Sequence, residues 1–389
     1  MAKKVFIVFV ILFLTMLLGF AIHSISSEEE SFIIGEKPTG AEVGEEDDPG
    51  GSNQTDPGEE EFNEGKLTKI IDGGMGVVRG VTLNYSTEQV LYYQKRNFLL
   101  ANFNGKTKSS VGGYPFINVK DIKWNITKEK ALVKDNHRYY IYDLNKNKAE
   151  ELSKKIDYAV WFKYMLKDKI AYKFYDVDTG KRKLAIADSD GQNEEVLVEE
   201  LPFRMVGIEI PENGSKVCYF REPDANFKAR LNCVNLKTKQ KEILHRGSFA
   251  ADYRWAKNGN RILTSYVSEQ IGSKMVLGSM NGKGGEFRSF NFPTSVDKCV
   301  WSKDNRKIYC AMMVFKEKNI ILPNDWSLSK YQSMDTFWEL DVETGKKRRL
   351  LESAEMTSVD ATNLFLDSNE GKLFFTDKNS KSVYVISLK

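Results

Sequence analysis

The sequence contains few side chains of the kinds that hydrolytic or metal-dependent enzymes use. Its 389 residues include three histidines, His23, His137 and His245. A Ser-His-Asp arrangement would have to use His137 or His245, because His23 ends an apolar N-terminal run and no Gly-x-Ser-x-Gly segment is present to position a serine nucleophile. No Gly-rich phosphate loop is present either. We therefore expect a protein without enzymatic activity and without a cofactor.

Carboxylates are the other candidates for acid–base chemistry. Glycoside hydrolysis needs two of them flanking the scissile bond, and a sequence does not give their separation in space. The Ser-x-Asp-x-Gly-x-x-Trp box of sialidases is absent. Asp176 begins a segment with the spacing of a calcium loop, but the twelfth position is Ala187 where such a loop has Glu, so we expect a plain turn and no metal. An enzyme would require carboxylates that converge in a central channel of the folded chain.

The cysteines have a spacing that favours disulfide bonds. They form two pairs: Cys218 with Cys233, and Cys299 with Cys310. If residues 303–306 are the loop of a hairpin, Cys299 and Cys310 lie at directly opposed strand positions. If residues 221–230 are also a hairpin loop, Cys218 and Cys233 lie at opposed positions in the same way. The alternative is four buried thiols that pack as small apolar groups. A zinc site is not expected, because no Cys-x-x-Cys spacing is present.

The chain from residue 66 onward consists of repeats that predict β-strands. A large apolar residue precedes a turn rich in Asn, Asp, Ser, Gly and Lys, and an apolar strand begins about seven residues later. This unit occurs seven times, at residues 83–90, 124–131, 161–170, 210–217, 255–262, 301–308 and 365–373. A second unit, an alternating strand that closes in a polar turn, recurs in phase with the first. Four strands in about 45 residues are typical of a β-propeller blade.

The two ends of this repeat region complement each other. The last copy supplies three strands, and residues 66–71 have the pattern of the missing outer strand. Pairing them would close the ring and remove two open sheet edges. We therefore predict an all-β fold, a seven-bladed β-propeller over residues 66–389 closed by an N-terminal strand. One transmembrane helix and a disordered acidic linker should precede it.

Two of the repeats resemble those of a known family. Residues 301–309 and 255–262 are similar to the Trp-Ser-x-Asp-Gly-x-x-Ile repeat of TolB-type, WD-like propellers, which also occurs in the propellers of prolyl-oligopeptidase-like peptidases. The resemblance covers most of residues 66–389 and is specific to the repeat. It implies an extracytoplasmic binding platform. The peptidase activity does not carry over, because no α/β-hydrolase domain follows the repeats.

The N-terminal segments predict attachment to a membrane. Lys3 and Lys4 precede the apolar run from Val5 to Ile22, so residues 1–27 are expected to be an uncleaved anchor, with a cleaved signal peptide as the alternative. The charge bias places the N-terminus inside and the propeller on the extracytoplasmic side. Residues 28–65 contain fourteen acidic residues and one lysine and should form a solvated tether; the alternative is that they mask the basic body.

Two loops are the candidate binding site. The tryptophans that recur at one position of the repeat should pack between blades, whereas Trp326 lies in an insertion, residues 316–335. The insertion mixes aromatic, aliphatic and cationic residues, as interfaces do; the alternative is a lid packed over the central channel. The loop of residues 221–230 should lie on the same face. The candidate residues of the two loops are Trp326, Ile321, Tyr331, Arg221, Phe227, Lys228 and Arg230.

These features predict a membrane-tethered, single-pass protein whose extracytoplasmic propeller is a non-catalytic interaction or scaffold module. Protein partners would bind the loop face, and the basic body could also meet an anionic polymer or lipid surface. Nucleic acid is not an expected partner on that side of the membrane. The alternative is a sensor that binds a glycan or an anionic envelope polymer. A hydrolase or lyase with an acid pair in the channel is the third hypothesis.

Overall fold

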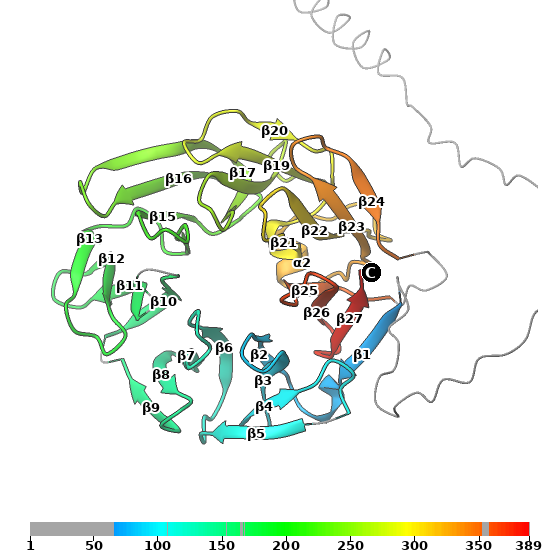
Figure 1. Ribbon diagram of the computed structural model, residues 1–389. Coiled ribbons are helices and arrows are strands. Elements are labelled where there is room, and N and C mark those ends of the chain that lie inside the picture. Colours follow the sequence, from blue (N-terminus) through cyan, green and yellow to red (C-terminus); the bar gives the residue numbers. More distant parts are fainter. Residues whose placement is uncertain are drawn as a thin grey trace, which may run out of the picture. The chain divides into compact units, whose positions relative to one another are not determined.

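A computed structural model describes residues 66–388 of the chain, except 107, 153, 164, 165, 167 and 352–357. Within these residues antiparallel strands make up nearly all of the regular structure, and their sheets follow one another around a ring (Figure 1). The predicted anchor and acidic linker, residues 1–27 and 28–65, lie outside the described residues. No helix of the described residues is long and apolar enough to span a membrane.

Three four-stranded sheets begin the ring, and each is a simple meander. The first contains β2 (Arg79–Asn84), β3 (Gln89–Gln94), β4 (Asn97–Ala101) and β5 (Lys108–Gly113). The second contains β6 (Val119–Trp124), β7 (Lys130–Asp135), β8 (Arg138–Asp143) and β9 (Lys148–Glu151). The third contains β10 (Ile156–Trp161), β11 (Lys169–Asp176), β12 (Lys181–Asp188) and β13 (Glu195–Val198).

A seven-stranded sheet follows, and one long strand joins its two halves. Its strands are β14 (Val206–Glu209), β15 (Lys216–Arg221), β16 (Lys228–Asn235), β17 (Lys241–Trp255), β18 (Arg261–Val267), β19 (Met275–Asn281) and β20 (Arg288–Ser289). The N-terminal part of β17, up to Phe249, pairs with β16, and the part from Phe249 onward pairs with β18. The strand β17 is therefore the outer strand of one half and the inner strand of the next.

Two more sheets complete the ring. The first contains β21 (Cys299–Trp301), β22 (Lys307–Met312), β23 (Thr336–Asp341) and β24 (Lys347–Arg349). The second contains β25 (Ala361–Leu366), β26 (Lys372–Asp377), β27 (Val383–Ser387) and β1 (Leu67–Ile71). Short helical turns lie at η1 (Gly73–Met75), η3 (Val296–Lys298) and α2 (Asn324–Ser327). The antiparallel pairing of β1 with β27 confirms the closure that the sequence predicted.

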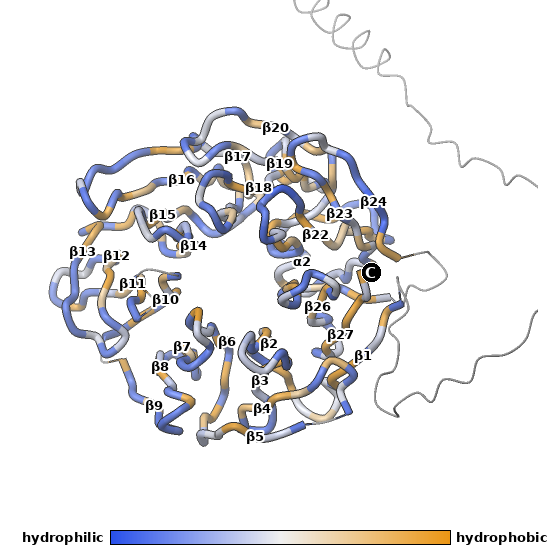
Figure 2. The backbone as a smooth tube through the Cα atoms, in the orientation of Figure 1, coloured by the Kyte–Doolittle hydropathy of each residue, from blue (hydrophilic) through white to orange (hydrophobic). Residues whose placement is uncertain are grey.

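Apolar side chains pack between neighbouring sheets and hold the ring together. Figure 2 shows hydrophobic positions along most strands of the ring. Phe162, Leu184 and Val206 belong to one cluster that links the third sheet to the seven-stranded sheet. The recurring tryptophans join sheets as predicted: Trp161, for example, donates its indole N–H to the backbone oxygen of Lys123 in the preceding sheet, at 2.8 Å. Burying such residues contributes about 2–3 kcal/mol each, so the sheets depend on their neighbours for stability.

Both predicted disulfides are present. Cys218–Cys233 joins β15 to β16, and Cys299–Cys310 joins β21 to β22, each at directly opposed strand positions. All four cysteines are buried within single sheets. The turn symmetry used in the prediction was therefore sufficient to find the pairs.

The innermost strands contain β-bulges at corresponding places. Register shifts occur in β2, β6, β10, β17 and β25, each in the first strand of a group of four. In β17 the shift spans Phe249 to Asp252, and Ala250 has a left-handed φ of 51°. An extra residue bends the strand and redirects the side chains that follow it. These bulges lie beside the central channel.

Candidate active site in the central channel

A cavity of about 610 Å³ lies in the channel at the centre of the ring. Its walls are the innermost strands β6, β10, β14 and β17, together with η3 and α2. In each wall strand, the residue just before the large apolar residue of the repeat lines the cavity. These residues are Lys123, Val160, Glu209 and Arg254. The apolar residues Trp124, Trp161 and Ile210 also border the cavity, and both tryptophans donate their indole N–H groups to the preceding sheet.

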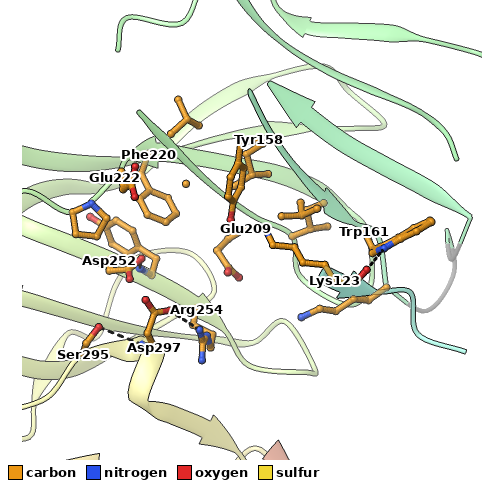
Figure 3. Close-up of a pocket in the computed structure, with 18 of the residues that line it drawn as sticks. Lys123, Tyr158, Trp161, Glu209, Phe220, Glu222, Asp252, Arg254, Ser295 and Asp297 are labelled. Atoms are coloured by element: carbon orange, nitrogen blue, oxygen red, sulfur yellow. Dashed lines mark hydrogen bonds and ion pairs between the residues drawn. The ribbon is translucent and has the colours of Figure 1, made fainter. Parts of the chain in front are cut away.

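Carboxyl groups from separate elements converge in this cavity. Glu209 comes from β14, Asp252 from β17 and Asp297 from η3 (Figure 3). Arg254, two residues after Asp252 in β17, also lines the cavity. Glu222, which follows β15, is exposed and also borders the cavity. This convergence is the arrangement that an enzyme of this fold would require. These carboxyl groups are spread over residues 209 to 297 of the sequence, and no sequence motif connects them.

The bulge in β17 aims two charged side chains at the cavity. Ala250 is fully buried and left-handed, and the shifted register after it places both Asp252 and Arg254 on the channel side. Tyr253, between them, is buried, and its hydroxyl donates to the backbone oxygen of Ala229 at 2.7 Å. A left-handed conformation is unfavourable for a residue with a Cβ atom, so the packing around Ala250 must hold it in place.

Arg254 and Asp297 form a fixed pair across two elements. The Arg254 Nη2 atom lies 2.9 Å from Oδ1 of Asp297, and its Nη1 donates to the backbone oxygen of Cys299 at 2.8 Å. The Ser295 hydroxyl caps η3 by accepting from the backbone N–H of Asp297. A planar guanidinium held at both nitrogens fixes the orientation of its carboxylate partner. Asp297 is therefore positioned before any ligand binds.

Asp252 has a very different environment from Asp297. Burial, followed by the negative charge of Asp297, raises the pKa of Asp252 well above its usual range, and Arg254 opposes this only in part. Burial also raises the pKa of Glu209. The Asp252 carboxyl group, half-buried near the negative charge of Asp297, favours its protonated form. The cavity thus combines a carboxylic acid with an ion-paired carboxylate.

An aromatic surface and a lysine face these acids. The Nζ atom of Lys123 lies 3.9 Å above the centre of the Tyr158 ring and donates to the backbone oxygen of Ala159 at 3.1 Å. Both side chains line the cavity (Figure 3). Asp121 is 3.6 Å from the same ammonium group. Aromatic faces next to polar groups are typical of sites that bind ring-shaped polar ligands.

The insertion packs against the cavity. Trp326 is buried with Ile320, Leu322 and Met313, and it lines the cavity. Its indole N–H lies 3.0 Å from both carboxylate oxygens of Asp360. Ile321 and Tyr331 are half-buried around it. This is the arrangement that the lid alternative describes.

The other predicted loop meets the insertion outside the cavity. The side chain of Asn324 in α2 accepts from the backbone N–H of Ala225 at 2.8 Å and donates to Asp224 at 3.1 Å. The structure therefore brings the two predicted loops together. The candidate side chains of this loop, none of which lines the cavity, are Arg221, Phe227, Lys228 and Arg230. Arg221 stacks on Phe227 at 4.0 Å.

The two described histidines lie away from the cavity. His137 is exposed in the turn between β7 and β8, and Nδ1 of His245 lies 2.8 Å from the hydroxyl of Tyr253. Neither lines the cavity. Among the described residues no group of three or more His, Cys, Asp or Glu side chains could hold a metal ion.

Comparisons with known proteins identify the fold. No protein-family model and no curated protein matches the chain. Among solved structures, an oligogalacturonate lyase from Vibrio parahaemolyticus is 11% identical with a TM-score of 0.62, over 83% of this chain and 93% of that one. An oligogalacturonate lyase in complex with manganese is 12% identical with a TM-score of 0.58, over 84% and 98%. The β-propeller domain of Cps50 (Swd1) from Myceliophteria thermophila is 12% identical with a TM-score of 0.55, over 85% and 100%.

The comparisons confirm one prediction and contradict another. The predicted propeller fold is confirmed, because a β-propeller domain is among the similar structures. The expected function, a non-catalytic interaction or scaffold module, is contradicted, because the oligogalacturonate lyases that share this fold are enzymes. The described residues do not fit a manganese ion, since they contain no metal-binding cluster. The physical reason for the wrong prediction is that the acids of the cavity are brought together only by folding.

Proposed function

We propose that the central channel is the active site of an enzyme that hydrolyses glycosidic bonds in an oligosaccharide. The observation that carries the proposal is the pairing of Asp252, whose pKa is raised, with Asp297, which Arg254 holds. Two carboxyl groups with different environments are the usual apparatus of this reaction. The likeness in fold to oligogalacturonate lyases supports a channel that acts on saccharides.

The two acids would have distinct roles. Asp252 gives its proton to the glycosidic oxygen as the bond from that oxygen to the anomeric carbon breaks. Asp297 stabilises the positive charge that develops on the sugar and takes a proton from the attacking water, whose oxygen bonds to the anomeric carbon. The products are two sugars with hydroxyl groups at the cleaved positions. Asp297 then releases to solvent the proton that it took from the water, and Asp252 regains a proton from solvent.

The walls of the cavity would position the sugar. Tyr158 offers an aromatic face, and Lys123 and Arg254 offer hydrogen-bond donors around it. A cavity of about 610 Å³ is within the usual size range for small-ligand sites. In this proposal the insertion and the loop of residues 221–230 form a rim over which a longer saccharide extends.

The architecture completes the proposal. We count the seven-stranded sheet as two blades that share β17, which gives seven blades in one ring. We also propose that residues 1–27 anchor the chain in the cell membrane and that residues 28–65 hold the enzyme on the extracytoplasmic side. The lysines before the apolar run and the acids after it support that orientation.

A cleavage assay tests this function. The full chain is incubated with a panel of neutral and acidic oligosaccharides, and the products are analysed by mass spectrometry. Hydrolysis adds the mass of one water to the products, whereas elimination leaves an unsaturated sugar. We expect Asp252→Asn to lower the rate by about 10²–10⁴-fold, while Asp178→Asn, in an exposed turn, leaves it unchanged. Absence of cleavage across the panel, or products of elimination alone, would overturn the proposal.

A further inference from the structure

Three lysines follow the ends of three of the wall strands. Lys128, Lys163 and Lys257 follow β6, β10 and β17, each two to four residues after the tryptophan that ends the strand. We call this group the lysine mouth. Lys128 and Lys163 line the cavity directly. The charge of Lys163 acts on both of the other two lysines.

The lysine mouth is not neutralised by ion pairs. Among the described residues no ion pair involves any of the three, whereas Lys130 and Lys169 nearby pair with Asp168 and Asp188. Burial, followed by the charge of Lys163, lowers the pKa of Lys128 to about 8. Burial also lowers the pKa of Lys257, with acids in part opposing this. Like charges in this setting repel each other, and a bound anion would relieve that repulsion.

The position of the lysine mouth connects it to the proposed catalytic groups. Lys163 acts electrostatically on Glu209, and Lys123 of β6 and Arg254 of β17 add positive charge to the cavity lining. The cavity lining also contains Glu212, which is acidic, and Tyr85, which contributes a hydroxyl group. A saccharide chain that carries several negative groups could therefore bind along the lysines and present a neutral glycosidic oxygen to Asp252.

We propose that the lysine mouth binds the anionic groups of the substrate, so that the enzyme acts on an acidic oligosaccharide that carries carboxylate or sulfate groups. This inference rests on the proposed function, because it names the substrate class of the same channel. Ammonium groups bind such anions through charge-assisted hydrogen bonds. Each contact of this kind changes affinity by about tenfold or more.

Binding without turnover tests the inference. The full chain with Asp252→Asn is titrated calorimetrically with a linear uronic acid tetramer, its sulfated counterpart and a neutral tetramer of the same linkage. We expect an acidic tetramer to bind at least about tenfold more tightly than the neutral one, with affinity that falls as salt rises. The two acidic ligands distinguish carboxylate from sulfate recognition. Equal affinity for all three tetramers would overturn the inference.

A charge-matched pair of variants locates the site. In the same background Lys128→Gln, Lys163→Gln and Lys257→Gln together should weaken acidic tetramer binding by at least about tenfold. Lys108→Gln, Lys274→Gln and Lys283→Gln remove the same charge from exposed positions outside the cavity and the two rim loops, and should change binding by less than about twofold. Circular dichroism verifies folding. If the first set binds as the parent does, the lysine mouth is not the site, whatever the cleavage assay shows.

The pH dependence gives an independent reading. Lys128 lines the cavity together with Lys163, Glu212 and Tyr85, and the charge of Lys163 acts on it. Because it loses its proton near pH 8, acidic tetramer binding should weaken as pH rises through that value, and binding should take up a proton there. Calorimetry in buffers of different ionisation enthalpy measures the uptake. Binding that is constant from pH 7 to about pH 9 would contradict the assignment of Lys128.

Discussion

At the scale of single residues, the environment of Asp252 lowers the stability of the folded protein at neutral pH. Burial of its carboxyl group and the nearby negative charge of Asp297 raise its pKa in the folded state. A folded-state pKa above the unfolded value of about 3.9 means that the group stabilises the protein in acid. That contribution is lost as pH rises through the raised pKa. Such costs are common at active sites.

This predicts that Asp252→Asn stabilises the folded protein. At neutral and alkaline pH the variant should unfold at a higher temperature, because an amide has no charge to desolvate. Its free energy of unfolding should be larger by about 1–3 kcal/mol. The difference should shrink as pH falls toward about 4, where the carboxyl is protonated in the folded state and begins to be protonated in the unfolded state. Thermal unfolding from acidic to alkaline pH measures it. Identical curves at alkaline pH would show that Asp252 is not held in an unfavourable charged state.

The individual residues of the site were the least predictable part of this protein. The cysteine pairs followed from turn symmetry, because both members lie in one hairpin. Glu209, Asp252 and Asp297 lie in different strands or turns, and no spacing connects them. One signal was available. The residue just before the large apolar residue of each repeat faces the channel, and this position contains Glu209 and Arg254. The bulge that turns Asp252 toward the channel left no such signal.

At the scale of elements, the bulge in β17 should matter for both stability and activity. Ala250 is buried and left-handed, a conformation that β-branched residues strongly disfavour. We expect Ala250→Val to destabilise the protein by about 1–2 kcal/mol more than Ala256→Val, which is equally buried and has an ordinary φ. Urea unfolding measures the difference. Equal losses would mean that overpacking alone explains both variants.

The insertion depends on a buried charged cluster. The Lys298 ammonium, fully buried, lies 2.6 Å from carboxylate oxygens of both Asp335 and Asp360, and Trp326 donates to Asp360. Lys298→Met leaves two buried carboxylates without a cation and should cost about 3–5 kcal/mol. Adding Asp335→Asn and Asp360→Asn should recover most of that loss, because no charge then remains buried. Denaturant unfolding checks both values, and a mild effect of Lys298→Met would contradict this role.

The length of the insertion could be predicted from the sequence, but its role could not. Its length and position on the loop face were evident, because it lengthens one repeat. Its alternatives, interface or lid, were not separable, because aromatic residues at a binding surface and in a packed cluster have the same composition. Trp326 packs inward because Lys298 and Asp360, distant in sequence, create a polar anchor for its indole N–H.

At the scale of the whole molecule, the fold was predictable because it repeats. Each repeat gives an independent reading of the same strands and turns, and the unpaired last repeat indicated closure by residues 66–71. Function was not predictable in this way, since propellers with the same architecture include enzymes and binding proteins. The side chains in the channel, rather than the architecture, distinguish them.

Ring closure gives a prediction at this scale. Ile70 and Ile71 of β1 are buried against β27, and the pairing covers the edge of the last sheet. A chain that begins at Gly73 should lose more than about 4 kcal/mol of stability and self-associate through the exposed edge. A chain that begins at Lys66 is the control and should unfold as the full chain does. Unfolding midpoints and gel filtration measure both effects, and equal behaviour of the two chains would contradict closure by β1.

The most direct test of the central claim is the leaving-group dependence of cleavage by Asp252→Asn. With an oligosaccharide the variant should lose about 10²–10⁴-fold in rate, because the departing oxygen needs a proton. With an aryl glycoside of the same sugar, whose phenolate leaves without protonation, the variant should retain a rate close to that of the native enzyme. Equal losses on both substrates, or unchanged cleavage of the oligosaccharide, would show that Asp252 is not the proton donor and that the channel does not work in the proposed way.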